Sequence, residues 1–207
     1  MTRGLRWGLV GLIVVVAAAV ALWPRGGDEP ATPERPAATA APVAAQQRAE
    51  AALAPCPSAV PGAVGSGPLA GITLGCLADG SSVDLAAALA GRPALLNLWA
   101  YWCGPCAEEL PMLREYAERA GDSVTVLTVH SDPDEAKALA RLSGLDVRLP
   151  GVLDADTRVR NAVEAPAVLP ISVLIRADGS LAQVVVRTFT GVDDIADTVA
   201  AALGVRA

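Results

Sequence analysis

Two cysteines separated by two residues follow an apolar segment, and this junction constrains the fold more than any other feature of the chain. Residues 94–100 have the composition of a buried central strand, and Trp102-Cys103-Gly104-Pro105-Cys106 comes directly after them. A helical pattern begins just beyond Cys106. The sequence therefore predicts a strand that ends at a turn carrying both thiols at the start of a helix.

This placement gives the two thiols different chemistry. Cys103 lies at the expected helix N-terminus, where unpaired backbone N–H groups and the helix dipole stabilise a thiolate. Cys106 lies on the same helical face and can attack a mixed disulfide formed at Cys103. We therefore expect a redox-active pair. A purely structural disulfide is the alternative, and Trp102 argues against it because it places the pair at an exposed end of the element.

The first part of the chain differs in composition from the rest. Arg3 and Arg6 precede a segment from Trp7 to Trp23 that contains no charged residue. We expect residues 1–23 to form a signal anchor, a single transmembrane helix, with a cleaved signal peptide as the alternative. Residues 24–55 are rich in Pro and Ala, which predicts a disordered linker. Both interpretations place the expected domain, residues 56–207, outside the cytoplasm, either held at the cell membrane or secreted.

Cys56 and Cys76 are the remaining two of the four cysteines. They lie in a Gly- and Pro-rich region, and in an exported chain we expect them to form a structural disulfide that restrains the N-terminal edge of the domain. The alternative is that one of them relays electrons to the Cys103–Cys106 pair, and nothing in the sequence favours it.

Composition argues against several classes of function. The net charge of −6 and the lack of a basic stripe make nucleic acid an unsuitable partner. We expect no organic cofactor, because no phosphate-binding loop or Ser-His-Asp set is evident, and no metal. A copper-binding chaperone is the alternative of another class, but His130 is the only histidine and there are only two methionines. We interpret His130 as a strand-edge side chain. A redox-silent scaffold is a third alternative.

The order of the expected elements predicts an α/β fold with a central mixed sheet flanked by helices, parallel in its first half and antiparallel at its second edge. The expected elements are a strand or hairpin near 72–77, a helix at 84–90, a strand at 94–100, a helix at 103–120 interrupted by Pro111, a strand at 124–129, helices at 131–143 and 154–163, strands at 171–175 and 181–186, and a helix at 193–204.

Residues 65–205 resemble the thioredoxin superfamily, and within it the exported thiol-disulfide oxidoreductases of the TlpA, ResA and DsbE type. The resemblance rests on the strand running into the Cys pair, on Glu109 before Leu110-Pro111, on Leu169-Pro170 before residues 171–175, and on the Asp178-Gly179 turn. It implies a thioredoxin fold and a cis peptide bond before Pro170, in a loop that holds an extended substrate chain against the Cys pair.

Two departures from the family pattern concern the mechanism. Asn97 stands where cytoplasmic thioredoxins have a buried aspartate that assists proton transfer. Glu109 matches the active-site glutamate of the ResA-like proteins, so the resemblance implies that Glu109 transfers the proton of Cys106; a solvated helix carboxylate is the alternative. Leu169 is the second departure, because many relatives carry a β-branched or polar residue before the proline, and it implies an apolar or undiscriminating substrate contact. We expect Trp102 to form part of the apolar rim that a substrate meets.

The resemblance implies an oxidoreductase that acts on protein disulfides or dithiols. Gly104-Pro105 resembles the dipeptide of reducing thioredoxins, which favours a membrane-tethered reductant supplied with electrons by a membrane redox partner, for example in cytochrome c maturation. An oxidant of secreted proteins is the alternative.

Overall fold

The computed structural model describes residues 45–206. The expected signal anchor at residues 1–23 and most of the expected linker lie outside the described residues. Between residues 45 and 206, no helix combines the length and the apolar composition needed to cross a bilayer.

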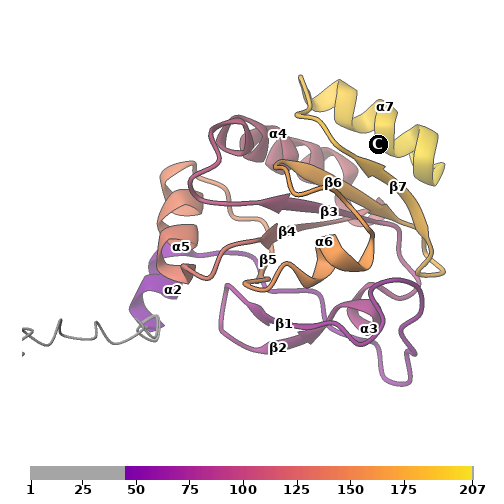
Figure 1. Ribbon diagram of the computed structural model, residues 1–207, viewed down its shortest axis with the longest axis horizontal. Helices are drawn as coiled ribbons and strands as arrows, with labels where there is room; N and C mark the ends of the chain where they lie inside the picture. The colour runs from indigo at the N-terminus through magenta and orange to yellow at the C-terminus, as the bar shows by residue number, and fades with distance from the viewer. Residues whose placement is uncertain (1–44, 207) are drawn as a thin grey trace, which may run out of the picture. The chain divides into compact units, whose positions relative to one another are not determined.

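In the described part of the chain, seven strands form one mixed sheet in the order β2-β1-β5-β4-β3-β6-β7 (Figure 1). β3 is parallel to β4 and β4 to β5, and the other neighbours are antiparallel. The strands are β1 (Thr73–Cys76), β2 (Ser82–Asp84), β3 (Ala94–Trp99), β4 (Thr125–His130), β5 (Gly151–Leu153), β6 (Ile171–Ile175) and β7 (Leu181–Val185).

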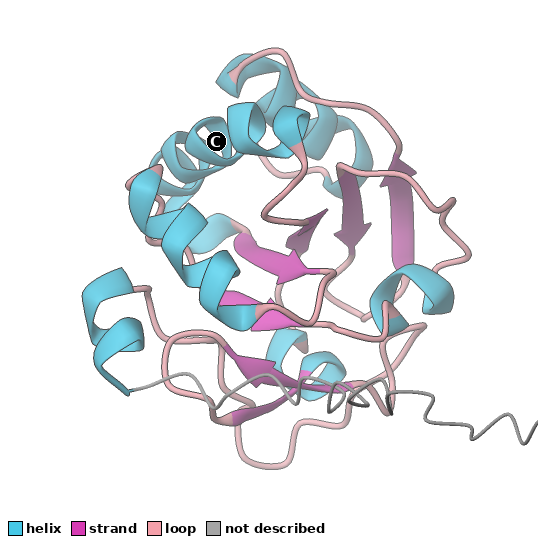
Figure 2. Cartoon of the chain, turned by 60° about the vertical axis from the view of Figure 1, so that its left-hand side comes forward, coloured by secondary structure: helices cyan, strands magenta, loops and turns pink. Residues whose placement is uncertain are grey.

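Helices lie on both sides of this sheet (Figures 1 and 2). They are α2 (Ala45–Ala51), α3 (Leu85–Leu89), α4 (Gly104–Ala120), α5 (Glu135–Gly144), α6 (Arg158–Ala162) and α7 (Val192–Leu203), with a 3-10 turn at Gly121–Ser123. The mixed sheet flanked by helices that the sequence predicts is therefore confirmed.

The core is divided by the sheet into two clusters. Every residue of β3 is buried because the strand is central and covered on both faces. Leu95 and Trp99 face the cluster formed with α4, α5 and α7, whereas Leu96 and Leu98 face the cluster formed with α3 and α6. By this alternation, the side chain of Asn97 points toward α4.

The C-terminal end of the expected disordered linker is instead ordered, so this prediction is wrong for residues 45–55. Residues 45–51 form α2, which packs on α5, and Ala51 and Leu53 are buried. Arg48 Nη2 lies 2.6 Å from Glu135 Oε1 of α5. The residues of this short helix show no sustained apolar face. Because the helix is stabilised by partners from a distant part of the sequence, its own residues do not predict it.

Two other elements differ from expectation. β5 lies between the expected helices at 131–143 and 154–163, where no element was expected, and its three residues are too few to give a periodic pattern. α4 continues through Pro111 as one helix of 17 residues, although proline lacks the backbone donor for that position.

Candidate functional site

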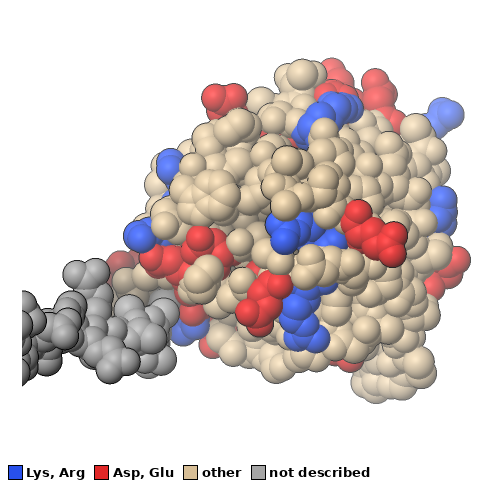
Figure 3. All heavy atoms as spheres, viewed as in Figure 1, with Lys and Arg blue, Asp and Glu red and all other residues tan. Residues whose placement is uncertain are grey.

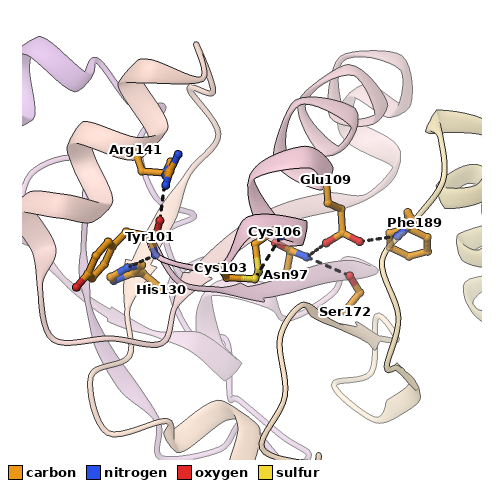
Figure 4. Close-up of a disulfide and its surroundings, with 9 residues drawn as sticks. All are labelled: Asn97, Tyr101, Cys103, Cys106, Glu109, His130, Arg141, Ser172 and Phe189. Atoms are coloured by element: carbon orange, nitrogen blue, oxygen red, sulfur yellow. Dashed lines mark hydrogen bonds between the residues drawn. A yellow bond between two sulfur atoms is a disulfide. The ribbon is translucent and has the colours of Figure 1, made fainter.

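The Cys103–Cys106 disulfide lies at the N-terminus of α4, just beyond the carboxyl end of β3 (Figure 4). Cys103 is the N-cap residue, and its Sγ accepts a hydrogen bond of 3.3 Å from the backbone N–H of Cys106. Cys103 keeps 6% of its surface exposed and Cys106 keeps none. Of the two residues, only Cys103, which carries the outer sulfur, has surface that another thiol or disulfide can approach.

The loop before β6 lies next to this end of β3. The peptide bond between Leu169 and Pro170 is cis, as the family resemblance implies. Leu98 of β3 pairs with Ile171 of β6, so the next residue outward, Pro170, lies beside Trp99. Pro170 is buried and Leu169 is half-buried. The loop and the Cys pair thus share one edge of the sheet.

The carboxylate of Glu109 is enclosed one helical turn after Cys106. Glu109 is fully buried. Its Oε2 accepts a hydrogen bond of 2.7 Å from Asn97 Nδ2, and its Oε1 accepts one of 2.8 Å from the backbone N–H of Phe189 (Figure 4). Asn97 also donates to Ser172 Oγ at 3.3 Å. The alternative of a solvated helix carboxylate is therefore wrong.

Burial raises the pKa of Glu109, and the hydrogen bonds from Phe189 and Asn97 oppose this by stabilising the anion. A carboxyl group that is held in this way can gain and lose a proton at a pH above the ordinary range of glutamate.

Sequence reasoning did not identify Ser172 or Phe189. Ser172 could have been found as a polar residue within an apolar strand, where it pairs with Asn97 across β3 and β6. Phe189 contributes a backbone N–H, for which no side-chain signal exists.

The turn before Cys103 is held by the last residue of β4 and by residues that follow this strand. Nε2 of His130 accepts a hydrogen bond of 3.3 Å from the backbone N–H of Tyr101, and Arg141 Nε donates to the carbonyl of Tyr101 at 3.0 Å (Figure 4). Trp102 is 58% exposed, and its indole N–H donates to Asp132 at 2.9 Å. The indole is thus oriented at the surface by Asp132, on the residue that precedes Cys103.

The expected strand-edge position of His130 needs correction. His130 is the last residue of β4, yet it is fully buried and its ring lies 4.7 Å from the ring of Trp99 in an edge-on arrangement. Burial lowers the pKa of His130 from 6.5 to about 4. The imidazole is therefore neutral at physiological pH and serves as an acceptor.

Cys56 and Cys76 are joined in a second disulfide. Cys76 belongs to the core cluster on the α3 and α6 side of the sheet, and Cys56 packs against that cluster. Cys103 and Cys106 belong to the cluster on the opposite side. The sheet therefore separates the two disulfides.

Acidic and basic side chains are interspersed on the face of the molecule shown in Figure 3. Within residues 45–206, no group of three or more His, Cys, Asp or Glu side chains is arranged to hold a metal ion.

Known proteins with similar sequences are thiol-disulfide oxidoreductases and thioredoxins. ResA of Bacillus subtilis strain 168, a thiol-disulfide oxidoreductase, is 30% identical over 113 residues, which make up 54% of this chain and 62% of ResA. The chain therefore spans less than two thirds of the length of this relative.

Two solved structures share the fold. A secreted disulfide oxidoreductase of Mycobacterium tuberculosis, homologous to DsbE of E. coli, aligns with a TM-score of 0.56 and 28% identity over 65% of this chain and 97% of that one. An exposed lipoprotein thioredoxin of Streptococcus pneumoniae strain TIGR4 aligns with a TM-score of 0.52 and 29% identity over 61% of this chain and 96% of that one. The thioredoxin-like fold is thereby confirmed.

The family comparison covers the whole sheet and the Cys pair together. Residues 55–203, most of the chain, match the Redoxin family. The chain therefore belongs to the Redoxin family.

Proposed function

We propose that this chain is an extracytoplasmic thiol-disulfide oxidoreductase whose redox couple is Cys103 and Cys106. The observation that carries the proposal is the asymmetry of the disulfide: Cys103 is slightly exposed at the cap of α4, while Cys106 is fully buried behind it. A structural cross-link has no need of a helix N-terminus, whereas an attacking thiolate is stabilised there.

In the reducing direction, the Cys103 thiolate attacks one sulfur of a client disulfide. A mixed disulfide forms, the client S–S bond breaks, and the other client sulfur leaves as a thiolate that takes up a proton. Cys106 then loses its proton and attacks Cys103 Sγ. The Cys103–Cys106 disulfide forms, the client leaves as a dithiol, and two electrons have passed from the protein to the client.

Glu109 is the proposed proton acceptor for Cys106 in the second step. It follows Cys106 by three residues on the same helix face, and its buried carboxyl has a raised pKa. In the opposite direction the same carboxyl returns the proton when the internal disulfide is reduced.

The proposed client surface consists of Trp102, Leu169 and Pro170. Trp102 is exposed and oriented by Asp132, and the loop with Leu169 and Pro170 begins at the same end of β3. Val168, next in that loop, is 49% exposed. These apolar groups suit a protein client whose cysteine is presented in an extended segment.

The proposed setting is the outer face of the cell membrane, where the chain acts as a tethered reductant that receives electrons from a membrane partner, for example in cytochrome c maturation. The uncharged segment from Trp7 to Trp23 supports export, as do the secreted and exposed lipoprotein relatives. The Cys103-Gly104-Pro105-Cys106 sequence supports the reducing direction.

Two measurements test this proposal. The first is insulin reduction by the parent protein and by Cys103→Ser and Cys106→Ser; we expect activity in the parent only, and equal activity in Cys103→Ser would exclude the assignment. The second is the reduction potential of the couple, for which a value near about −270 mV supports a reductant and one near about −120 mV an oxidant.

A further inference from the structure

An ion pair joins the turn after β7 to the first turn of α7, next to the segment that donates a hydrogen bond to Glu109. Arg187 makes two hydrogen bonds to Asp194, from Nη1 to Oδ2 at 2.6 Å and from Nη2 to Oδ1 at 2.7 Å. Its guanidinium also lies 5.0 Å from the centre of the Phe189 ring. Phe189 is the residue whose backbone N–H donates to Glu109.

Asp194 fixes the other end of the same turn. Its Oδ2 accepts hydrogen bonds from the backbone N–H of Thr190 at 3.0 Å and from the Thr190 hydroxyl at 3.2 Å. The residues on both sides of Phe189 are therefore bound to one carboxylate. Arg187 holds the pKa of Asp194 well below its usual range, so Asp194 stays ionised and the pair persists.

We propose that Arg187 and Asp194 are positioning residues for Glu109, because their ion pair holds residues 187–190 in the shape that keeps the Phe189 N–H on the carboxylate. This inference rests on the proposed role of Glu109. It assigns a function to an ion pair that does not touch the cysteines.

The charges of Arg187 and Asp194 also influence the pKa of Glu109. Asn97 on β3, which donates to Glu109, is neutral, and so is Ser172 on β6, which accepts from Asn97. Arg187 lowers the pKa of Glu109, and Asp194 raises it. Loss of Arg187 therefore removes a cation and frees the turn, while the anion of Asp194 remains. Both changes, and the remaining anion, favour the protonated form of Glu109.

The test uses the Phe189 amide as its own reporter, in the 15N-labelled full-length protein with its disulfides formed. We expect the amide resonance of the parent to follow the protonation of Glu109, and we expect Glu109→Gln to abolish this titration. We expect Arg187→Gln to raise the titration midpoint by about one pH unit and to speed hydrogen exchange at Phe189 several-fold.

Arg119→Gln is the matched control. Arg119 pairs with Asp193, the neighbour of Asp194, at 2.7 Å, so this variant loses the same charge from an adjacent ion pair. We expect this variant to leave the titration midpoint and the hydrogen-exchange rate of the Phe189 amide unchanged. Arg187→Lys keeps the charge but cannot make both hydrogen bonds to Asp194. We therefore expect hydrogen exchange at Phe189 in this variant to be as fast as in Arg187→Gln.

Three results would overturn the inference: unchanged Phe189 readouts in Arg187→Gln, an equal effect of Arg119→Gln, or complete restoration by Arg187→Lys, which would leave charge alone as the cause. Insulin reduction by the parent separates this inference from the proposed function. An active parent with an unresponsive Phe189 amide overturns only the positioning role, whereas a responsive amide in an inactive parent overturns only the proposed function.

Discussion

The backbone N–H of Tyr101 donates a hydrogen bond to Nε2 of His130, which joins the turn before Cys103 to the end of β4. Because Nε2 accepts, the neutral ring carries its proton on Nδ1. A second proton would bind to Nε2, which would then be a donor facing the donor N–H of Tyr101. The hydrogen bond therefore requires a neutral His130.

This relationship predicts a loss of stability in acid. The pKa of His130 falls from 6.5 to about 4 on folding, mainly because of burial. The unfolded chain thus binds the proton more tightly, and stability present above about pH 6.5 is lost as the pH falls toward 4, by on the order of 3 kcal/mol. Chemical denaturation across this range measures it. His130→Gln keeps an acceptor that does not titrate, and an equally steep loss in that variant would contradict the assignment.

Asn97→Asp is expected to destabilise the protein as the pH rises. Asn97 Nδ2 lies 2.7 Å from Glu109 Oε2, so the substitution places two buried carboxyl groups in contact, and both cannot ionise at low cost. We expect a loss of about 2 kcal/mol or more near pH 8 relative to pH 5, measured by urea unfolding. The exposed Asn161→Asp on α6 is the control, and similar losses in both variants would show that burial beside Glu109 is not the cause.

Removal of the Cys56–Cys76 disulfide is expected to affect stability but not exchange. The double variant Cys56→Ala/Cys76→Ala should lose about 3 kcal/mol of unfolding free energy, because the cross-link no longer restricts the unfolded chain. The rate of insulin reduction should equal that of the parent at a temperature where both are folded. A lower rate under those conditions would instead support an electron relay through these cysteines.

Trp102→Ala is expected to separate client contact from thiol chemistry. Trp102 is 58% exposed, so its loss should leave the unfolding free energy nearly unchanged. We expect the rate of insulin reduction to fall several-fold and the rate with glutathione disulfide to stay the same, since only the protein client reaches the indole. Val64→Ala, at a position 86% exposed in another loop, should change neither rate. Equal losses of rate with insulin and with glutathione disulfide in Trp102→Ala would assign Trp102 to the thiol chemistry instead.

Much of the fold could be predicted because its strands are long and apolar. β3, β4 and β6 are runs of five or six mostly apolar residues, and each was expected within one residue of its observed bounds. β5 could not be predicted because three residues carry no period. α2 could not be predicted because it depends on Arg48 reaching Glu135, a partner from a distant segment.

The cysteine positions at the site follow from local sequence, whereas the surroundings of Glu109 do not. A helix N-terminus after a buried strand is sufficient to place Cys103 and Cys106. The burial of Glu109 depends on Asn97 from β3 and on the backbone of Phe189, which only the three-dimensional packing of α4 and α7 brings together.

The ordered residues at 45–56 also determine how the domain would respond to a mechanical load. The chain is fastened to α5 through Arg48 and Glu135, and then to the end of β1 through the bond between Cys56 and Cys76. A pull applied at residue 45 would first be resisted by the ion pair and next by a covalent link. β3 and α4, which position Cys103 and Cys106, would be shielded from that force, so tension at the N-terminal end would not disturb the exchanging sulfurs.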